Sequence, residues 1–256
     1  MIRALAVASF AIASVASAAD YQRVLLPVYT IGQVLPGANG SLWSTELAVE
    51  NRTSTDILIG PCAAGFPIPD SLACLPDPLT IPAHAVGRDP QVSHTPSGLR
   101  GEFVYLLTRD LANLQLELTL SQRGVAVARL PVVREADYST GTLSMLDVSV
   151  SPGSRALVRI YGLDNRPATA RVQMFKMETS GTKVFDGRIT LVRSPYDIPD
   201  FPLAPSYAEV PLDGYVREGE SVRITISEIE GDRLWAFATV TSATGETVVV
   251  ITPAAY

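Results

Sequence analysis

The side chains best suited to catalysis are few in this chain. It has two histidines, His84 and His94, and two cysteines, Cys62 and Cys74, all within a proline-rich stretch from residue 61 to 99. A serine hydrolase needs a nucleophile, a histidine base and an orienting acid, and the sequence has no G-x-S-x-G motif to present such a serine. Because an isolated loop histidine lacks this machinery, the sequence favours a protein that is not an enzyme, and no catalytic residue is predicted.

The cysteines indicate a disulfide rather than a metal site. Structural zinc takes four ligands, and neither Cys62 nor Cys74 has a histidine or a third cysteine beside it. In an exported chain a cysteine pair is typically oxidised. We therefore expect a Cys62–Cys74 bond that pins the loop 61–99, and we expect no cofactor.

Two groups of carboxylates could also do chemistry. The spacing of Glu228, Glu230 and Asp232 places three acids at the end of a strand, which is where a calcium ion could bind but is also an ordinary exposed strand end. The sequence does not decide whether these three residues bind a metal. Asp197 and Asp200 lie in a proline-rich crossover and would resemble a glycosidase pair only if the fold brought a cleft to them.

Alternating apolar and polar residues predict strands through most of the chain, and no sustained helical period is visible after the first residues. In the expected first strand, 22–30, Pro27 indicates an edge position because proline cannot donate to a ladder. Residues 41–61 and 233–253 both contain Leu-Trp near their start, then a small polar turn and an aliphatic run closed by proline. We interpret both as β-hairpins, with Trp43 and Trp235 buried inside separate β-sandwiches.

Residues 1–18 have the pattern of a cleaved signal peptide, with a basic start, an apolar run and an Ala-Ser-Ala cleavage site. No later stretch is long and apolar enough for a membrane span. We expect an exported mature chain, periplasmic or extracellular, that is not inserted in a membrane. The net charge of −6 disfavours nucleic acid as a partner, since that requires a basic surface. A protein or a glycan is the expected partner.

The predicted fold class is all-β, with two antiparallel β-sandwich domains at 19–138 and 139–256. The stretches GSLWSTELAVEN, LVRIYGLDN and RLWAFATVTSATGETVVVITP together resemble exported bacterial proteins of uncharacterised function with immunoglobulin-like domains. This resemblance implies a fold and a location outside the cytoplasm, but it identifies no site residues. The chain lacks the buried inter-sheet cysteine pair of antibody domains, so any kinship with those is architectural.

The function expected from these observations is binding, or a structural role in the cell envelope or outside the cell. The alternative is a carbohydrate-active or other hydrolase with a site between the domains. A hydrolase would need a cleft with convergent carboxylates, whereas a binding module would present a flat or aromatic face. Sugar-binding sandwiches expose tryptophan as a stacking surface, but each tryptophan here lies in an apolar strand, which favours burial.

Replacing both cysteines by serine should lower the free energy of unfolding by roughly 3 kcal/mol, the value for closing a loop of this size. Urea unfolding of the double variant and the wild type measures the difference. Thiol titration of the denatured wild type, with and without reductant, is the companion measurement. Two reactive thiols before reduction would contradict the predicted bond.

Overall fold

The computed structural model describes residues 21–30, 34–36, 41–59, 79–88, 100–193, 197–198, 201–202 and 204–254. Within these ranges nearly all regular structure is β-strand, and every pairing between named strands is antiparallel, which confirms the all-β prediction. The described helical turns are α1 (Thr108–Leu111) and a 3-10 turn (Glu135–Asp137). No helix in the described ranges has the length and hydropathy of a membrane span.

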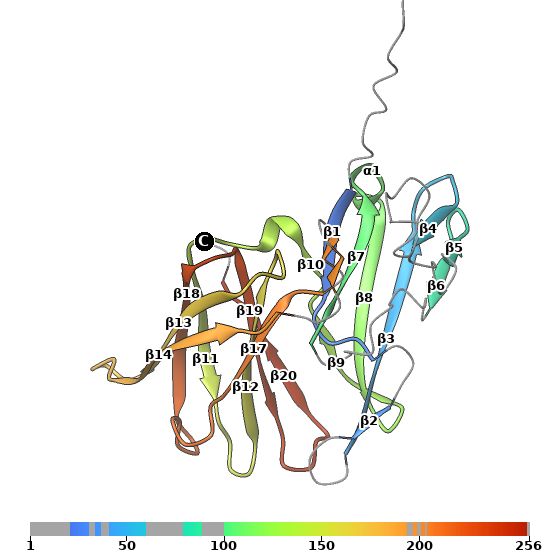
Figure 1. Ribbon diagram of the computed structural model, residues 1–256. Helices are drawn as coiled ribbons and strands as arrows, with labels where there is room; N and C mark the ends of the chain where they lie inside the picture. The colour runs from blue at the N-terminus through green and yellow to red at the C-terminus, as the bar shows by residue number, and fades with distance from the viewer. Residues whose placement is uncertain are drawn as a thin grey trace, which may run out of the picture.

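The N-terminal half, strands β1 to β10, forms two facing layers (Figure 1). The inner layer has the order β10 (Val133–Arg134), β1 (Tyr21–Leu26), β7 (Glu102–Leu107). The outer layer has the order β2 (Leu35–Pro36), β3 (Leu42–Asn51), β8 (Leu114–Gln122), β9 (Val125–Leu130), with β6 (Val86–Arg88) also paired to β3. A separate pair consists of β4 (Ile57–Ile59) and β5 (Leu79–Ile81).

The C-terminal half, strands β11 to β20, is a β-sandwich of two four-stranded sheets. Its outer sheet has the order β11 (Thr142–Ser149), β18 (Ser221–Glu230), β13 (Ala168–Lys176), β14 (Lys183–Leu191). Its inner sheet has the order β17 (Ser206–Pro211), β12 (Arg155–Gly162), β19 (Leu234–Thr241), β20 (Val248–Ile251). A short pair, β15 (Asp197–Ile198) and β16 (Phe201–Pro202), lies in the crossover before β17. The predicted hairpin at 233–253 is confirmed by the pairing of β19 with β20.

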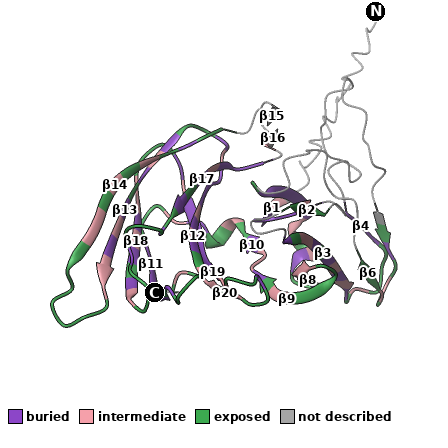
Figure 2. Ribbon diagram, turned by 90° about the horizontal axis from the view of Figure 1, so that it is seen from below, coloured by how far each residue is buried: buried purple, intermediate pink, exposed green. Residues whose placement is uncertain are grey.

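Alternation along the inner sheet of the C-terminal half divides its side chains between two apolar clusters. Ala156, Val158 and Ile160 of β12 point into the sandwich and pack with the apolar face of the outer sheet. Because successive side chains of a strand face opposite ways, Tyr161 faces away from the sandwich. Figure 2 shows β12 largely buried, in contrast to the exposed edge strand β14.

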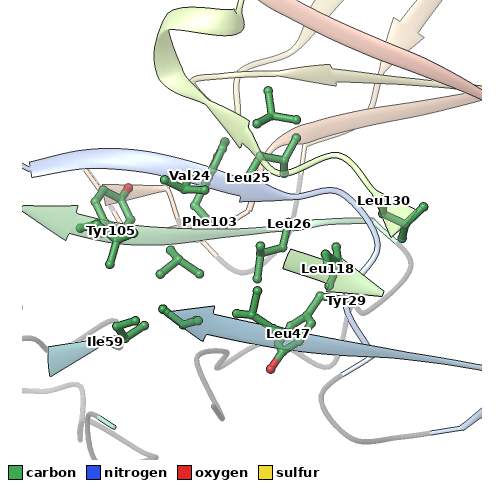
Figure 3. Packing of buried hydrophobic residues seen from close by; sticks show 14 of the residues in the cluster. Val24, Leu25, Leu26, Tyr29, Leu47, Ile59, Phe103, Tyr105, Leu118 and Leu130 are labelled. Carbon is green, nitrogen blue, oxygen red and sulfur yellow. The ribbon is translucent and has the colours of Figure 1, made fainter. Parts of the chain in front are cut away.

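The outward face of that inner sheet packs against the inner sheet of the N-terminal half. Tyr161, Trp235 and Phe237 belong to the same apolar cluster as the core of the N-terminal half. Figure 3 shows that core, where side chains of β1 and β7 meet those of β3 and β8, including Leu26, Leu47 and Leu118. Strands β7 and β19 of the two inner sheets are therefore buried on both faces, and four sheets are stacked in sequence.

This stacking corrects the prediction for the second tryptophan. Trp235 is buried, with 6% of its surface exposed, but it lies between the two halves and not inside its own sandwich. Its ring centroid is 5.4 Å from that of Phe237 and 6.0 Å from that of Tyr161. The C-terminal half has an apolar interior of its own, as predicted, but the apolar cluster of the N-terminal half also includes Tyr161, Trp235 and Phe237 of the C-terminal half.

Two further predictions about the N-terminal half are wrong. Strand β1 is central and not at an edge, because it ends at Leu26, before Pro27, and pairs with β10 and β7. The predicted hairpin at 41–61 does not form, since β3 pairs with β8 from Trp43 to Asn51 while β4 pairs with β5. Asn51 explains the difference: its buried amide donates to the carbonyls of Thr55 and Ile81, so the chain leaves the sheet instead of returning along it.

The predicted irregular loop 61–99 contains regular structure in its described part, where β5 begins at Leu79 and β6 ends at Arg88. Cys62 and Cys74 lie outside the described residues, so their disulfide stays a prediction. No sheet in the described ranges combines strands from before and after the expected boundary at 138/139. Whether 19–138 and 139–256 fold independently stays a prediction as well.

We expect Tyr161→Phe to lower the free energy of unfolding by about 1–3 kcal/mol, because it removes the donor to a carbonyl that lies in buried surroundings. The Tyr161 hydroxyl donates to the Pro27 carbonyl across the two halves at 2.7 Å. Urea unfolding followed by circular dichroism measures the change. Tyr215→Phe is the matched control, since that side chain is 44% exposed; equal losses in both variants would contradict the expectation.

Candidate ligand site between the two halves

The interface between the halves has an apolar centre. Polar side chains lie at both ends of β12, in an ion-pair network at one end and around a cavity at the other. At the end near Leu163, Arg23 of β1 crosses to the C-terminal half. Its Nη1 donates to the Leu163 carbonyl at 2.9 Å, and its Nη2 to Asp164 Oδ1 at 2.9 Å. Glu135 joins this group, with Oε1 3.1 Å from Arg23 Nη2 and 3.0 Å from Arg233 Nη2. Burial alone would raise the pKa of Glu135, but its bonds to Arg23 and Arg233 outweigh burial and lower it.

Asp232 lies buried beside this ion-pair network. Its Oδ2 accepts a hydrogen bond of 2.6 Å from the Asp164 backbone N–H, while its Oδ1 and the buried Ser206 hydroxyl have no hydrogen-bond partner within the described part of the chain. Burial raises the pKa of Asp232 to about 6, and the negative charge of Asp164 adds to this although the backbone bond opposes it. Gly162 allows this close arrangement, because a Cβ there would meet both Ser206 Oγ and Asp232 Oδ2.

At the opposite end of β12 the two halves enclose a cavity of about 320 Å³. It is lined from both sides, so neither half forms it alone. The N-terminal half contributes apolar side chains, namely Val28, Leu35, Pro36, Trp43, Leu120 and Leu130. The C-terminal half contributes most of the polar ones, namely Arg155, Arg159, Glu209, Asp213, Thr239 and Thr241, together with Ala156, Leu157, Pro211 and Val248.

Arg159 is a charged side chain of the cavity that contacts both neighbouring strands. Its Nε lies 3.1 Å from Glu209 Oε1 on the neighbouring strand β17, and its Nη1 donates to Thr239 Oγ1 on β19 at 3.0 Å. Its Cζ lies 5.7 Å from the centroid of the Phe237 ring, within range of a cation–π interaction. The side chain is 15% exposed. Contacts to two strands and a ring therefore fix the guanidinium group where it lines the cavity.

Trp43 provides the aromatic surface of the cavity and is half-buried. Its Nε1 donates to Ser41 Oγ at 2.9 Å, which satisfies the one polar atom of the indole. The turn of the β19–β20 hairpin approaches it closely: Gly245 has φ +75°, and a Cβ there would lie 3.5 Å from Trp43 Cζ2. The prediction that Trp43 is buried inside a sandwich is therefore wrong, since the half-buried side chain lines the cavity between the halves and belongs to neither apolar cluster.

Apart from Trp43, none of the described residues that the sequence singled out lines this cavity. Glu228 and Glu230 pair with Ala170 and Thr169 in the outer sheet, whereas Asp232 is turned into the interface. His84 is exposed in the turn between β5 and β6 with φ +56°. His94 and Asp200 lie outside the described residues, and for Asp197 the structure describes the backbone alone. The described residues contain no cluster of three or more metal-ligating side chains.

Sequence reasoning missed Arg159, Glu209 and Thr239. They are separated along the chain and become neighbours only because β17, β12 and β19 are adjacent in one sheet. The signal that could have identified them is a charged or hydroxyl residue within strands that are otherwise apolar, such as Arg159 in RALVRIYG. A charge in a strand buried on both faces needs a partner.

Asp232→Asn should change how stability depends on pH. The pKa of Asp232 is about 6 in the folded protein and 3.8 for an ordinary aspartate, so the folded state binds the proton more tightly. The wild type therefore loses stability relative to the variant as pH rises from 4 to 7, by up to roughly 3 kcal/mol. Urea unfolding of both proteins across this pH range measures the difference.

Asp186→Asn is the control of opposite sign. Hydrogen bonds from Arg171 and Lys183 lower the pKa of the exposed Asp186, so its contribution is present at neutral pH and is lost as pH falls. The stability of the wild type relative to this variant should therefore rise with pH. If the two comparisons follow pH in the same direction, the assignment for Asp232 fails.

Comparison of the chain with protein-family models, with curated proteins and with solved structures finds no match in any of the three. The resemblance to exported bacterial proteins with immunoglobulin-like domains therefore stays a prediction. The functional argument consequently depends on the geometry of this cavity, an apolar wall facing a polar one between two stacked β-sheets.

Proposed function

We propose that the protein is an exported, non-catalytic binding protein built from two immunoglobulin-like β-sandwich domains, and that its ligand occupies the cavity between them. The observation that carries this proposal is the cavity itself, with about 320 Å³ of space between the halves. Small-molecule sites in proteins are typically concave, mostly apolar with a few placed polar groups, about 300–1,000 Å³ in volume and often located between domains. The cavity between the two halves has each of these properties.

The state of the carboxylates in the cavity favours binding over hydrolysis. A hydrolase requires an acid or base that is free to exchange a proton with the substrate. Glu209 lies 3.1 Å from Arg159 Nε in an ion pair, and that arginine is held in turn by Thr239. Such a pair is suited to orient a ligand through fixed donors and acceptors. The hydrolase alternative would depend on Asp213, the other carboxylate that lines the cavity.

The same cavity also favours binding over a purely structural role in the envelope. A structural interface gains stability when apolar side chains fill it, because empty space loses dispersion contacts. Here the centre of the interface is filled by Tyr161, Trp235 and Phe237, while the end near Trp43 stays open and carries charged side chains. We infer that this end is retained for a ligand.

Tryptophan fluorescence tests this proposal directly. In the variant Trp235→Phe, Trp43 is the sole remaining tryptophan, and it lines the cavity. We expect its emission to change saturably with at least one class in a panel of neutral and acidic oligosaccharides, free amino acids, short peptides and fatty acids. A transfer of the indole to a drier environment should shift the emission to shorter wavelength.

A cavity-filling substitution provides the control. Thr241→Phe places a ring in the cavity from β19 and should weaken the response at least about tenfold. Thr190→Phe makes the same change on the exposed edge strand β14 and should leave the response intact. The proposal fails if no class in the panel changes Trp43 emission, or if both threonine variants respond alike.

A further inference from the structure

We propose that the ligand of the interdomain cavity is a neutral glycan, bound with the apolar face of one sugar ring against Trp43 and its hydroxyls toward Arg159 and Glu209. This inference rests on the proposed function, because it assigns a ligand class to the same site. It follows from the distribution of apolar and polar groups around the cavity, from its charge, and from its position on the face of a sheet.

The two walls of the cavity differ in polarity, and a sugar ring differs in the same way. The wall from the N-terminal half is apolar and includes Trp43, Leu35 and Leu120, whereas the wall from the C-terminal half carries Arg159 and Glu209. A pyranose presents C–H groups on its face and hydroxyls around its edge. It can therefore bury its apolar face on one wall while its hydroxyls reach the other, which neither a fatty acid nor a small ion can do.

The charges lining the cavity balance each other. Arg155 and Arg159 are opposed by Glu209 and Asp213, so the formal charge of the lining is zero. An anionic ligand would meet two carboxylates and a cationic ligand two guanidinium groups, and like charges in close contact are costly. Balanced charges on a fixed polar wall favour a ligand that is neutral and rich in groups that both donate and accept.

The Arg159–Glu209 pair supplies the donors and acceptors that adjacent hydroxyls require. A guanidinium group only donates and a carboxylate only accepts, whereas each hydroxyl does both. With Nε and Oε1 3.1 Å apart, the two charged groups lie side by side and can each bind one of two neighbouring hydroxyls. The bond from Arg159 to Thr239 fixes this geometry before the ligand arrives, which reduces the entropic cost of binding.

Trp43 is held in a way that leaves its ring available for stacking. Its Nε1 is already bonded to Ser41 Oγ at 2.9 Å, and one edge of its six-membered ring lies close to Gly245 of the opposite half. The indole therefore contributes an apolar surface of fixed orientation rather than a hydrogen-bond donor. Such a surface suits the C–H face of a sugar.

The position of the site disfavours an extended peptide. Peptides commonly bind by adding a strand to a free sheet edge. The polar side chains here rise from the face of the sheet: β12 has β17 and β19 on its two sides, and β19 has β12 and β20. Neither of these two strands offers an unpaired backbone edge to the cavity, so Arg159 and Thr239 contact a ligand through their side chains.

A glycan array followed by titration tests the assignment. The mature protein should bind at least one neutral oligosaccharide among cello-, malto-, xylo-, manno- and chito-oligosaccharides, and the same sugar should change Trp43 emission in the Trp235→Phe background. Glu209→Gln, which keeps the shape of the side chain but not its charge, should weaken binding roughly 10- to 100-fold. Trp43→Ala should weaken it at least as much, with unfolding curves recorded to show that each variant is folded.

Asp186→Asn is the matched control, because Asp186 also pairs with an arginine across two neighbouring strands, 2.8 Å from Arg171, on the opposite sheet of the same half. It should leave glycan binding unchanged. Binding of an acidic sugar, a peptide or a fatty acid with no neutral glycan would overturn this inference and leave the proposed function standing. Glycan binding that survives both cavity variants would also overturn it. A protein that binds none of the classes would refute both proposals.

Discussion

The packing of one β-sheet against another across the middle of the molecule is the interaction on which the rest of the structure depends. The sheet containing β12 and β19 covers its own sandwich with one face and the sheet of β1 and β7 with the other. Tyr161 lies at the centre of this contact, with no exposed surface, a stacked Phe237 ring 6.2 Å away and a hydrogen bond to the N-terminal half. Its burial and this bond join the two halves at this contact.

The two ends show how one strand can serve two purposes. Near Leu163 the interface is closed by charged groups that pair across it, with Arg23 of one half contacting Asp164 of the other. Near Arg159 the charged groups pair within one half, and the facing half supplies apolar side chains. Ion pairs across the interface hold the two halves together. Ion pairs within one half leave the space between the halves open to a ligand. We infer that this difference along β12 gives the protein a fixed arrangement and a binding site together.

Sequence patterns predicted the strands well where one face is buried and less well where both are. Thr45, Leu47 and Val49 are buried as their alternation predicted, and β19 with β20 forms the expected hairpin. The role of Trp235 could not be predicted, because a strand such as LWAFATVT is buried on both faces and its sequence does not show which face meets its own sandwich. Buried sheets read as continuous apolar runs for this reason.

The prediction of a hairpin at 41–61 was wrong because of one local side chain. Asn51 lies where the small polar turn of residues 41–61 was expected, yet its side chain is buried and donates to the backbone carbonyls of Thr55 and Ile81. The candidate site could not be predicted from the sequence for a different reason, since no local sequence pattern links Trp43 to Arg159 and Glu209. Those residues meet because whole sheets dock, and sheet docking depends on the shape of two complete surfaces.

The contact between the inner sheets also has a consequence for the two halves taken separately. A chain cut at the predicted boundary would leave Trp235 and Phe237 on one piece, and Leu25 and Phe103 on the other, facing water. Exposed apolar faces of this kind promote association. Each half therefore shields an apolar face of the other from water, and we expect the separated pieces to associate with other proteins through these faces.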